Sequence, residues 1–317
     1  MILVLSSRFC GHSQDPHIAL LKNSINRLGV PSLFLDPHKI LEYNCSLCVV
    51  DNKITFLFED KIICPEIVYL SSPIRPDCIV SFLGVCKYPN LYRRQAEAFW
   101  DDFCMAFESA KWFPGLPWDL KRSDSKIMML LEAGKCGLRI PWTVNASSFP
   151  VDLGDVAYKK PITQPFCISH NTETGIEVGL TCYAQKEHRA SYISDYGLHQ
   201  WQRAIDAQAQ VRCFMVKEKI WASRWDRSGV EAFVDFRKVN ASFRVDWQPT
   251  ILDHGLVHSL QRLCKKMNIC IAAPEFLEDQ DGNLWFVDLN PLGDWYGFFD
   301  EGIHQEIADA IAEAVTW

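Results

Sequence analysis

The chain has 317 residues and a formal net charge of −7 at pH 7; 48% of its residues are hydrophobic and 22% are charged. This composition is typical of a folded chain, and the length predicts two or three lobes with more than one core. The negative charge argues against non-specific binding to nucleic acid, and no apolar stretch approaches the length that spans a bilayer, so we expect no membrane segment.

The first residues and the 13 cysteines together predict a cytoplasmic protein. Residues 1–7 lack a basic leader and are too short for a signal peptide. Without such a signal, an odd number of cysteines in apolar stretches is typical of reduced, mostly buried thiols. The one C-x-x-C pair, Cys45 and Cys48, has no second pair at zinc-finger spacing. We expect both thiols to pack in a strand, with a metal or redox site as the alternative.

The first third of the chain, up to residue 117, is expected to form a small α/β domain. An apolar strand over residues 1–6 is followed by a helix that begins at Asp15, as N-cap, and ends at Gly29. A strand over 32–35 would then complete a βαβ unit. The remaining elements expected here are a hairpin over 49–58 that turns at Asp51-Asn52, a strand over 67–70 and an amphipathic helix over 93–111.

A segment rich in proline and aromatic residues, 112–118, breaks that helix and marks the first expected domain boundary. Ser123 is then expected to cap a further helix, with Lys126 in its first turn and Gly137 at its end. The apolar spacing predicts that Ile127, Leu130 and Leu131 form the inner face of this helix.

From residue 156 onward the chain is rich in expected strands. They cover 156–160, 180–184, 211–216, 220–223, 270–277 and 284–289, and two helices are expected over 256–267 and 303–315. This mixture predicts an α/β or α+β fold.

Acidic residues flank a predicted turn near the C-terminus. Asp281-Gly282-Asn283 is expected to join two apolar strands, with Glu275 before the turn and Asp288 after it. Asp288 and Asn290 are two residues apart and therefore share a face, and Glu275 could lie on the same face across the ladder. Such a set of oxygen ligands suits magnesium held with the phosphates of a nucleotide. The alternative is an ordinary acidic hairpin with a solvated face.

This hairpin resembles the metal-binding end of the ATP-grasp ligases, in which two acidic residues and an Asn-Pro hold two magnesium ions. The order of the preceding segments is similar to that of the graspetide synthetases, the microviridin-type ligases that cyclise ribosomal peptides. The segments that carry this resemblance are the helix from Arg93, 112–118, 126–138, 140–145, 158–161, 201–202, 211–212, 235–237 and 290–295. It implies an ATP-grasp fold with a pre-ATP-grasp α/β domain over 1–117, a central and lid subdomain over 118–203 and a C-terminal subdomain over 204–317.

The resemblance also implies a role for nine residues. Lys126 and Lys160 would face the ATP phosphates, Gln202 would lie near the adenine, and Arg212 would contact the transferring phosphate or the acyl phosphate. Glu275, Asp288 and Asn290 would hold magnesium, whereas Asp235 and Arg237 would face the acceptor substrate. The alternatives are an exposed first-turn Lys126, Lys159 in place of Lys160 in the cleft, a structural carboxylate beside Arg212, and a surface ion pair of Asp235 with Arg237.

The implied activity is ATP-dependent ligation of a carboxylate to an amine or hydroxyl through an acyl phosphate, acting on a peptide. A ligase for a free amino acid or small amine is the first alternative, and a non-catalytic ATP-binding regulatory protein is the second. The sequence departs from the graspetide pattern at Glu275, where aspartate is more frequent, at Asp294, where an amide is expected, and in its N-terminal domain. Because of these departures, the resemblance does not identify the substrate. The sequence also does not decide between a monomer and a homodimer.

Overall fold

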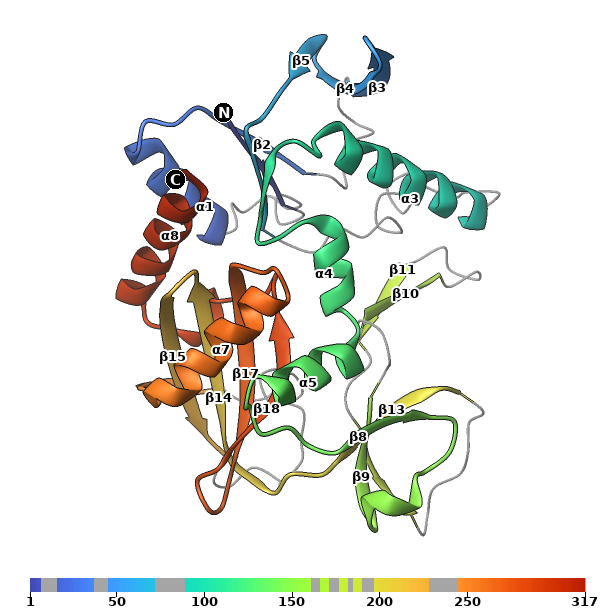
Figure 1. Cartoon of the computed structure of the whole chain (residues 1–317), viewed down its shortest axis with the longest axis vertical. Helices are drawn as coiled ribbons and strands as arrows, with labels where there is room; N and C mark the ends of the chain where they lie inside the picture. The colour runs from blue at the N-terminus through green and yellow to red at the C-terminus, as the bar shows by residue number, and fades with distance from the viewer. Residues whose placement is uncertain are drawn as a thin grey trace. The chain divides into compact units, whose positions relative to one another are not determined.

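The computed structural model describes residues 1–6, 16–36, 45–71, 89–160, 166–170, 177–181, 185–189, 197–227 and 245–316. The chain forms two compact units, one of residues 1–117 with 300–317 and one of residues 118–299 (Figure 1). Among the described residues, none of the helices combines the length and the apolar character that crossing a membrane requires. The division of residues 118–317 into a lid and a C-terminal subdomain stays a prediction.

A parallel four-stranded sheet forms the centre of the first unit. β1 (Ile2–Leu5) pairs with β2 (Ser32–Leu35) on one side and with β6 (Ile67–Leu70) on the other, and β6 pairs with β7 (Lys111–Phe113). Every residue of β1 is buried, as is typical of a strand inside a parallel sheet. α1 (Pro16–Arg27) connects β1 to β2, so the expected βαβ unit is confirmed. Asp15, its expected N-cap, lies outside the described residues.

The last helix of the chain, α8 (Glu301–Thr316), packs against α1 in this unit. A polar cluster joins the two helices: Ser24 Oγ donates to Asp309 Oδ1 at 2.6 Å, and Gln305 Nε2 donates to the same oxygen at 2.8 Å. Arg27 forms an ion pair with Asp309 as well. These contacts connect residues almost three hundred positions apart in the sequence.

A small antiparallel sheet of β3 (Cys45–Val50), β4 (Lys53–Phe58) and β5 (Lys61–Ile63) completes the first unit with α3 (Pro89–Ala106). Asp51 and Asn52 have φ angles of +51° and +62°, which a tight hairpin turn of this length requires, so the expected hairpin is confirmed. The ring of Phe56 on β4 packs edge-on against Phe103 and Phe107 at 5.0 and 5.8 Å.

The segment after α3 differs from expectation. The predicted helix over 93–111 ends at residue 106, and Trp112 and Phe113 belong to β7 instead of an irregular breaker. Both side chains are buried, and pairing with β6 satisfies the backbone of a strand that is too short to show an alternating pattern.

The second unit contains two larger sheets and a hairpin. A five-stranded antiparallel sheet has the order β16-β15-β14-β17-β18, and a four-stranded antiparallel sheet has the order β12-β9-β13-β8. The strands of the first are β14 (Ala207–Val216), β15 (Lys219–Asp226), β16 (Gln248–Thr250), β17 (Ile271–Asp279) and β18 (Leu284–Asn290). Those of the second are β8 (Thr143–Ala146), β9 (Val156–Lys160), β12 (Gln185–His188) and β13 (His199–Arg203), and β10 (Phe166–His170) pairs with β11 (Glu177–Thr181).

Three helices of the second unit are α4 (Pro117–Ser123), α5 (Lys126–Lys135) and α7 (His254–Lys266). Ser123 ends α4 and its hydroxyl donates to Leu120 O at 2.6 Å, so the expectation that it caps the next helix is wrong. The N-cap of α5 is Ser125. The expected inner face of α5 is wrong at Leu131, which is 46% exposed, because Met129, Leu130 and Ala133 form the buried face.

Candidate active site

Three predicted site residues form a row across three adjacent strands of the five-stranded sheet. Arg212 on β14 lies opposite Glu275 on β17, and Glu275 lies opposite Asp288 on β18. Directly opposed residues of an antiparallel pair have neighbouring side chains on one face. The prediction that Glu275 lies across the ladder from Asp288 is therefore confirmed, and Arg212 extends the row by one strand.

Arg212 is the one charged residue in the apolar sequence of β14. Its side chain is only 12% exposed and forms an ion pair with Glu275, whose side chain is 17% exposed. The guanidinium also lies over the ring of Phe298, 4.2 Å from its centroid. Gln210, two residues earlier on the same strand face, contacts the other carboxylate oxygen of Glu275 at 3.5 Å. Arg212 thus has an anionic partner among the predicted metal ligands.

Lys126 supplies a second cation to this row. It is the first residue of α5, and its Nζ forms an ion pair with Asp288 Oδ1. A basic residue is unfavourable at the positive N-terminal end of a helix unless an anion lies nearby, so helix and side chain together favour negative charge at this place. Leu289 N also donates to Asp288 Oδ1, at 2.8 Å.

The groups around Asp288 shift the pKa of its carboxyl. Burial alone raises the pKa of a carboxyl, but the charge and hydrogen bond of Lys126, the charge of Lys160 and the Leu289 N–H outweigh it. The pKa of Asp288 is consequently held below its ordinary value. The carboxylate is therefore ionised at neutral pH and available to a cation.

Lys160 and Gln202 lie together on the four-stranded sheet. Lys160 Nζ donates to Gln202 Oε1 at 2.6 Å, and Gln202 Nε2 donates to Thr143 Oγ1 at 3.1 Å. Lys159 is paired with Trp201, which is fully buried in the small hydrophobic core of this sheet. Alternation therefore places Lys160, and not Lys159, on the polar face that carries Gln202.

Asn290 ends β18 and shapes the turn that follows. Its Oδ1 accepts from Leu292 N at 3.0 Å. A Cβ on Gly293 would lie 2.3 Å from the Cβ of Ala273, so this close approach requires glycine. Asp294, at the position where an amide was expected, accepts from Tyr296 N at 3.0 Å. Asp235 and Arg237, the predicted substrate residues, lie outside the described residues.

No family model and no curated protein sequence matches the chain. A RiPP-associated ATP-grasp ligase of Chryseobacterium gregarium, solved with ADP and a leader and core peptide, is 19% identical, with 99% of this chain and 96% of that chain covered and a TM-score of 0.79. The macrocyclase MdnC of Microcystis aeruginosa MRC, solved with precursor peptide MdnA, is 14% identical, with 100% and 99% covered and a TM-score of 0.78. The chain has the ATP-grasp fold.

A third solved structure resembles this chain less closely. The D-cycloserine synthetase DcsG is 13% identical and has a TM-score of 0.56, with 99% of this chain and 100% of that chain covered. The match to the two peptide-bound proteins is thus closer than the match to DcsG. The predicted ATP-grasp fold is confirmed. The similar solved structures include ligases that act on ribosomal peptides, the class of enzyme that the sequence motifs resemble.

The residues of this ATP-grasp chain meet the chemical requirement for magnesium. Glu275 and Asp288 supply hard carboxylate oxygens from directly opposed positions of neighbouring strands, and each carboxylate forms an ion pair with a cationic side chain. Among the described residues, no group of three His, Cys, Asp or Glu lies close enough to hold a metal by itself. Magnesium usually takes one or two carboxylates and completes its coordination shell with phosphates and water.

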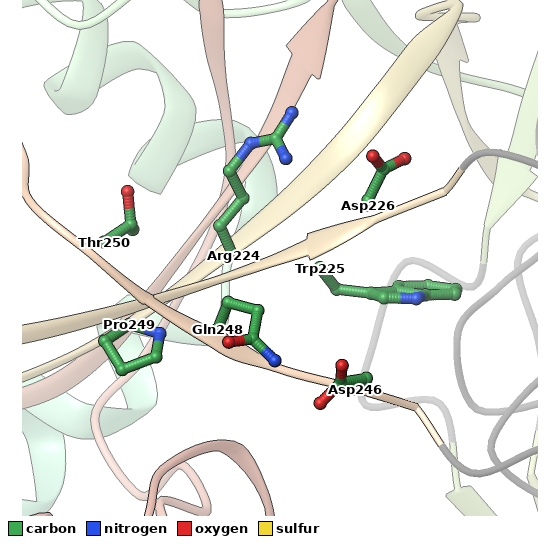
Figure 2. Close-up of a pocket in the computed structure, with 7 residues that line it drawn as sticks. All are labelled: Arg224, Trp225, Asp226, Asp246, Gln248, Pro249 and Thr250. Atoms are coloured by element: carbon green, nitrogen blue, oxygen red, sulfur yellow. The ribbon is translucent and has the colours of Figure 1, made fainter.

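A cavity of about 300 Å³ lies elsewhere, at the edge of the five-stranded sheet (Figure 2). It is lined by Arg224, Trp225, Asp226, Asp246, Gln248, Pro249 and Thr250, none of which is a predicted site residue. Arg224 is paired in two hydrogen bonds with Glu278, at 2.8 and 3.1 Å, which raises the pKa of the guanidinium. Its charge is therefore already satisfied.

Three residues of the site were missed by sequence reasoning: Thr143, Gln210 and Phe298. Gln210 could have been found, because it lies two positions before Arg212 in one strand and must share its face. No local signal marks Phe298 or Thr143, since each reaches its partner only through the folding of distant segments.

Proposed function

We propose that this protein is an ATP-dependent carboxylate ligase that modifies a ribosomal peptide through an acyl phosphate. The observation that carries the proposal is the row of Arg212, Glu275 and Asp288, in which both carboxylates lie side by side and each is balanced by a cation. An ordinary solvated hairpin has no need of a partly buried arginine and a helix-terminal lysine directed at its two carboxylates.

In the proposed reaction the substrate carboxylate oxygen attacks the γ-phosphorus of ATP. The bond from that phosphorus to the bridging oxygen breaks, which releases ADP and leaves an acyl phosphate. An amine or hydroxyl then attacks the acyl carbon, phosphate leaves, and the attacking group loses a proton. The products are an amide or ester, ADP and phosphate.

The residues of the chain would supply charge and position for these steps. Lys126 and Lys160 would neutralise the phosphates, and Gln202 would lie near the adenine. Arg212 would bind the oxygens of the transferring phosphoryl group with its planar fork. Glu275, Asp288 and Asn290 would hold magnesium, which we propose to be two ions and which would offset the charge that develops on the phosphate oxygens.

A peptide substrate is supported by two of the solved structures that this chain resembles. The Chryseobacterium gregarium ligase was solved with a leader and core peptide, and MdnC with a precursor peptide. A ligase for a small amine is the second candidate, because DcsG has the same fold at a lower TM-score. A non-catalytic ATP-binding protein is disfavoured, since a decayed site would be expected to lose Glu275, Asp288 or Asn290.

Asp235 and Arg237 complete the proposal as residues that face the acceptor-bearing substrate. If they do, Arg237→Ala should weaken use of the peptide while leaving Mg-ATP binding nearly intact. Equal loss of both would contradict this assignment and leave the reaction class untouched. A cytoplasmic location and a choice between monomer and homodimer stay predictions.

The test is the incubation of the protein with Mg-ATP and peptides encoded beside its gene. Release of ADP, measured by a coupled assay, and loss of one or more water masses from the peptide, measured by mass spectrometry, would support the proposal. Formation of AMP and pyrophosphate would overturn the reaction class. ADP release with a small amine and not with any peptide would favour the second candidate.

A further inference from the structure

A chain of three hydrogen bonds leads from Lys160 back to the protein backbone. Lys160 Nζ donates to Gln202 Oε1 at 2.6 Å, Gln202 Nε2 donates to Thr143 Oγ1 at 3.1 Å, and Thr143 Oγ1 donates to Pro141 O at 2.9 Å. The second and third distances lie in the normal range for protein hydrogen bonds, and the first is slightly shorter. The three side chains come from different strands, β9, β13 and β8.

The sheet register explains why these side chains meet. Thr143 lies directly opposite Gln202, and Lys160 lies opposite Gln200, two residues away from Gln202 on the same face. Direct and diagonal neighbours on one face are within reach of long side chains. Gln202 is buried, with only 2% of its surface exposed, so its amide has little freedom to find water as a substitute partner.

The hydrogen bond to the backbone determines which group donates and which accepts in the other two hydrogen bonds. A threonine hydroxyl has one hydrogen, and Thr143 donates it to Pro141 O, a carbonyl that can only accept. The hydroxyl oxygen is then left to accept, which orients the NH₂ group of Gln202 toward Thr143 and its carbonyl oxygen toward Lys160. If the amide were reversed, two donors would face each other at Lys160 and two acceptors at Thr143.

We infer that Thr143 is a positioning residue for Lys160: its hydroxyl fixes the amide of Gln202 so that the Gln202 oxygen holds the ammonium group of Lys160 in place. This inference rests on the proposed function, in which Lys160 faces the ATP phosphates. Thr143 contacts neither nucleotide nor substrate in this scheme. It acts by reducing the number of positions that a long, flexible cation occupies before the nucleotide binds.

The test is a double-mutant cycle read out by calorimetric binding of Mg-ADP, which needs no turnover. Thr143→Val keeps the shape of the side chain and suits a strand, but it removes the hydroxyl. We expect it to weaken Mg-ADP binding by about threefold to tenfold, the effect of one fixed hydrogen bond, whereas Thr143→Ser should stay within about twofold of wild type. In a Lys160→Met background, Thr143→Val should have almost no further effect on affinity.

The outcomes show whether or not Thr143 acts on nucleotide binding through Lys160. If Thr143→Val weakens binding equally in both backgrounds, or if Thr143→Ser is as weak as Thr143→Val, Thr143 does not act through Lys160 and the inference is overturned. Affinity unchanged in Thr143→Val would overturn it too. If the wild-type protein binds no Mg-ADP at all, the proposed function itself fails. Melting temperatures of the wild type and the four variants separate any loss of folded protein from loss of affinity.

Discussion

The ion pair between Lys126 and Asp288 leads to a prediction about the protein without nucleotide. Lys126→Met removes the ammonium group but keeps most of the side-chain length, and methionine is as good a helix former as lysine. α5 should therefore still begin at residue 126. Asp288 would keep its place opposite Glu275 with one fewer cation nearby.

The size of the effect follows from how far the pair is exposed. Both side chains are 27% exposed, between a surface pair, which contributes about 0–1 kcal/mol, and a fully buried pair, whose disruption costs about 3–5 kcal/mol. We expect Lys126→Met to lower the free energy of unfolding by about 1–2 kcal/mol at pH 7. For a unit of this size that corresponds to a melting temperature lower by roughly 2–8 °C.

The pH dependence of this loss has a definite sign. The pKa of Asp288 is lowered in the folded protein, so its contribution to stability is present above the ordinary aspartate pKa of about 4 and is lost as the pH falls through the folded-state pKa. The difference between wild type and Lys126→Met should thus be largest near neutral pH and should shrink below about pH 4.

Magnesium without nucleotide provides the sharper measurement. Removal of the lysine charge leaves the two carboxylates more negative, so Mg²⁺ should raise the melting temperature of Lys126→Met by more than it raises that of wild type. Lys121→Met is a matched control, because Lys121 is an exposed lysine on the preceding helix. Equal effects of Mg²⁺ on wild type and Lys126→Met, or a stability loss as small as that of Lys121→Met, would refute the reasoning.

Three further predictions concern single residues. Glu275→Gln and Asp288→Asn should each reduce ADP release by about a hundredfold or more with folding intact, because each removes charge that holds magnesium. Near-normal turnover in either variant would show that its carboxylate belongs to an ordinary solvated hairpin. Arg212→Lys should also impair turnover, since lysine keeps the charge but loses the planar fork that binds two oxygens; full activity would show that charge alone suffices. Asp279 accepts a hydrogen bond from Trp285 Nε1, and this bond, together with those from Asn283 N and Asp281 N, holds the pKa of Asp279 at about 2. Asp279→Asn should therefore lower the melting temperature at pH 7, with a difference that shrinks as the pH falls from about 4 toward 2; a difference independent of pH would contradict this cause.

Much of the fold could be predicted because its elements carry local signals. Apolar spacing and a terminal glycine mark α1, and Asp51-Asn52 marks the β3–β4 turn. The strand at Trp112 and Phe113 could not be predicted, because three residues beside a proline show no period and form a strand only by pairing with β6. Ser123 and Ser125 are equally good capping residues in sequence, and only the path of α4 decides between them.

The candidate site could be predicted only in its parts. The spacing of Asp288 and Asn290, and the turn between Glu275 and Asp288, follow from strand alternation. That Lys126 reaches Asp288, 162 positions away, depends on how α5 packs against β18 and has no local signal. The arginine in an apolar strand did predict an anionic partner, but the sequence does not say which one.

The return of α8 to the first unit has a consequence for biosynthesis. The first 117 residues emerge from the ribosome well before residues 300–317, which belong to the same compact unit. At about 5–20 residues per second, the intervening segment takes roughly 10–40 s to translate. During that time α1 exposes the surface that α8 later covers, and Ser24 and Arg27 lack Asp309. The unit that is begun first on the ribosome is therefore the unit that is completed last.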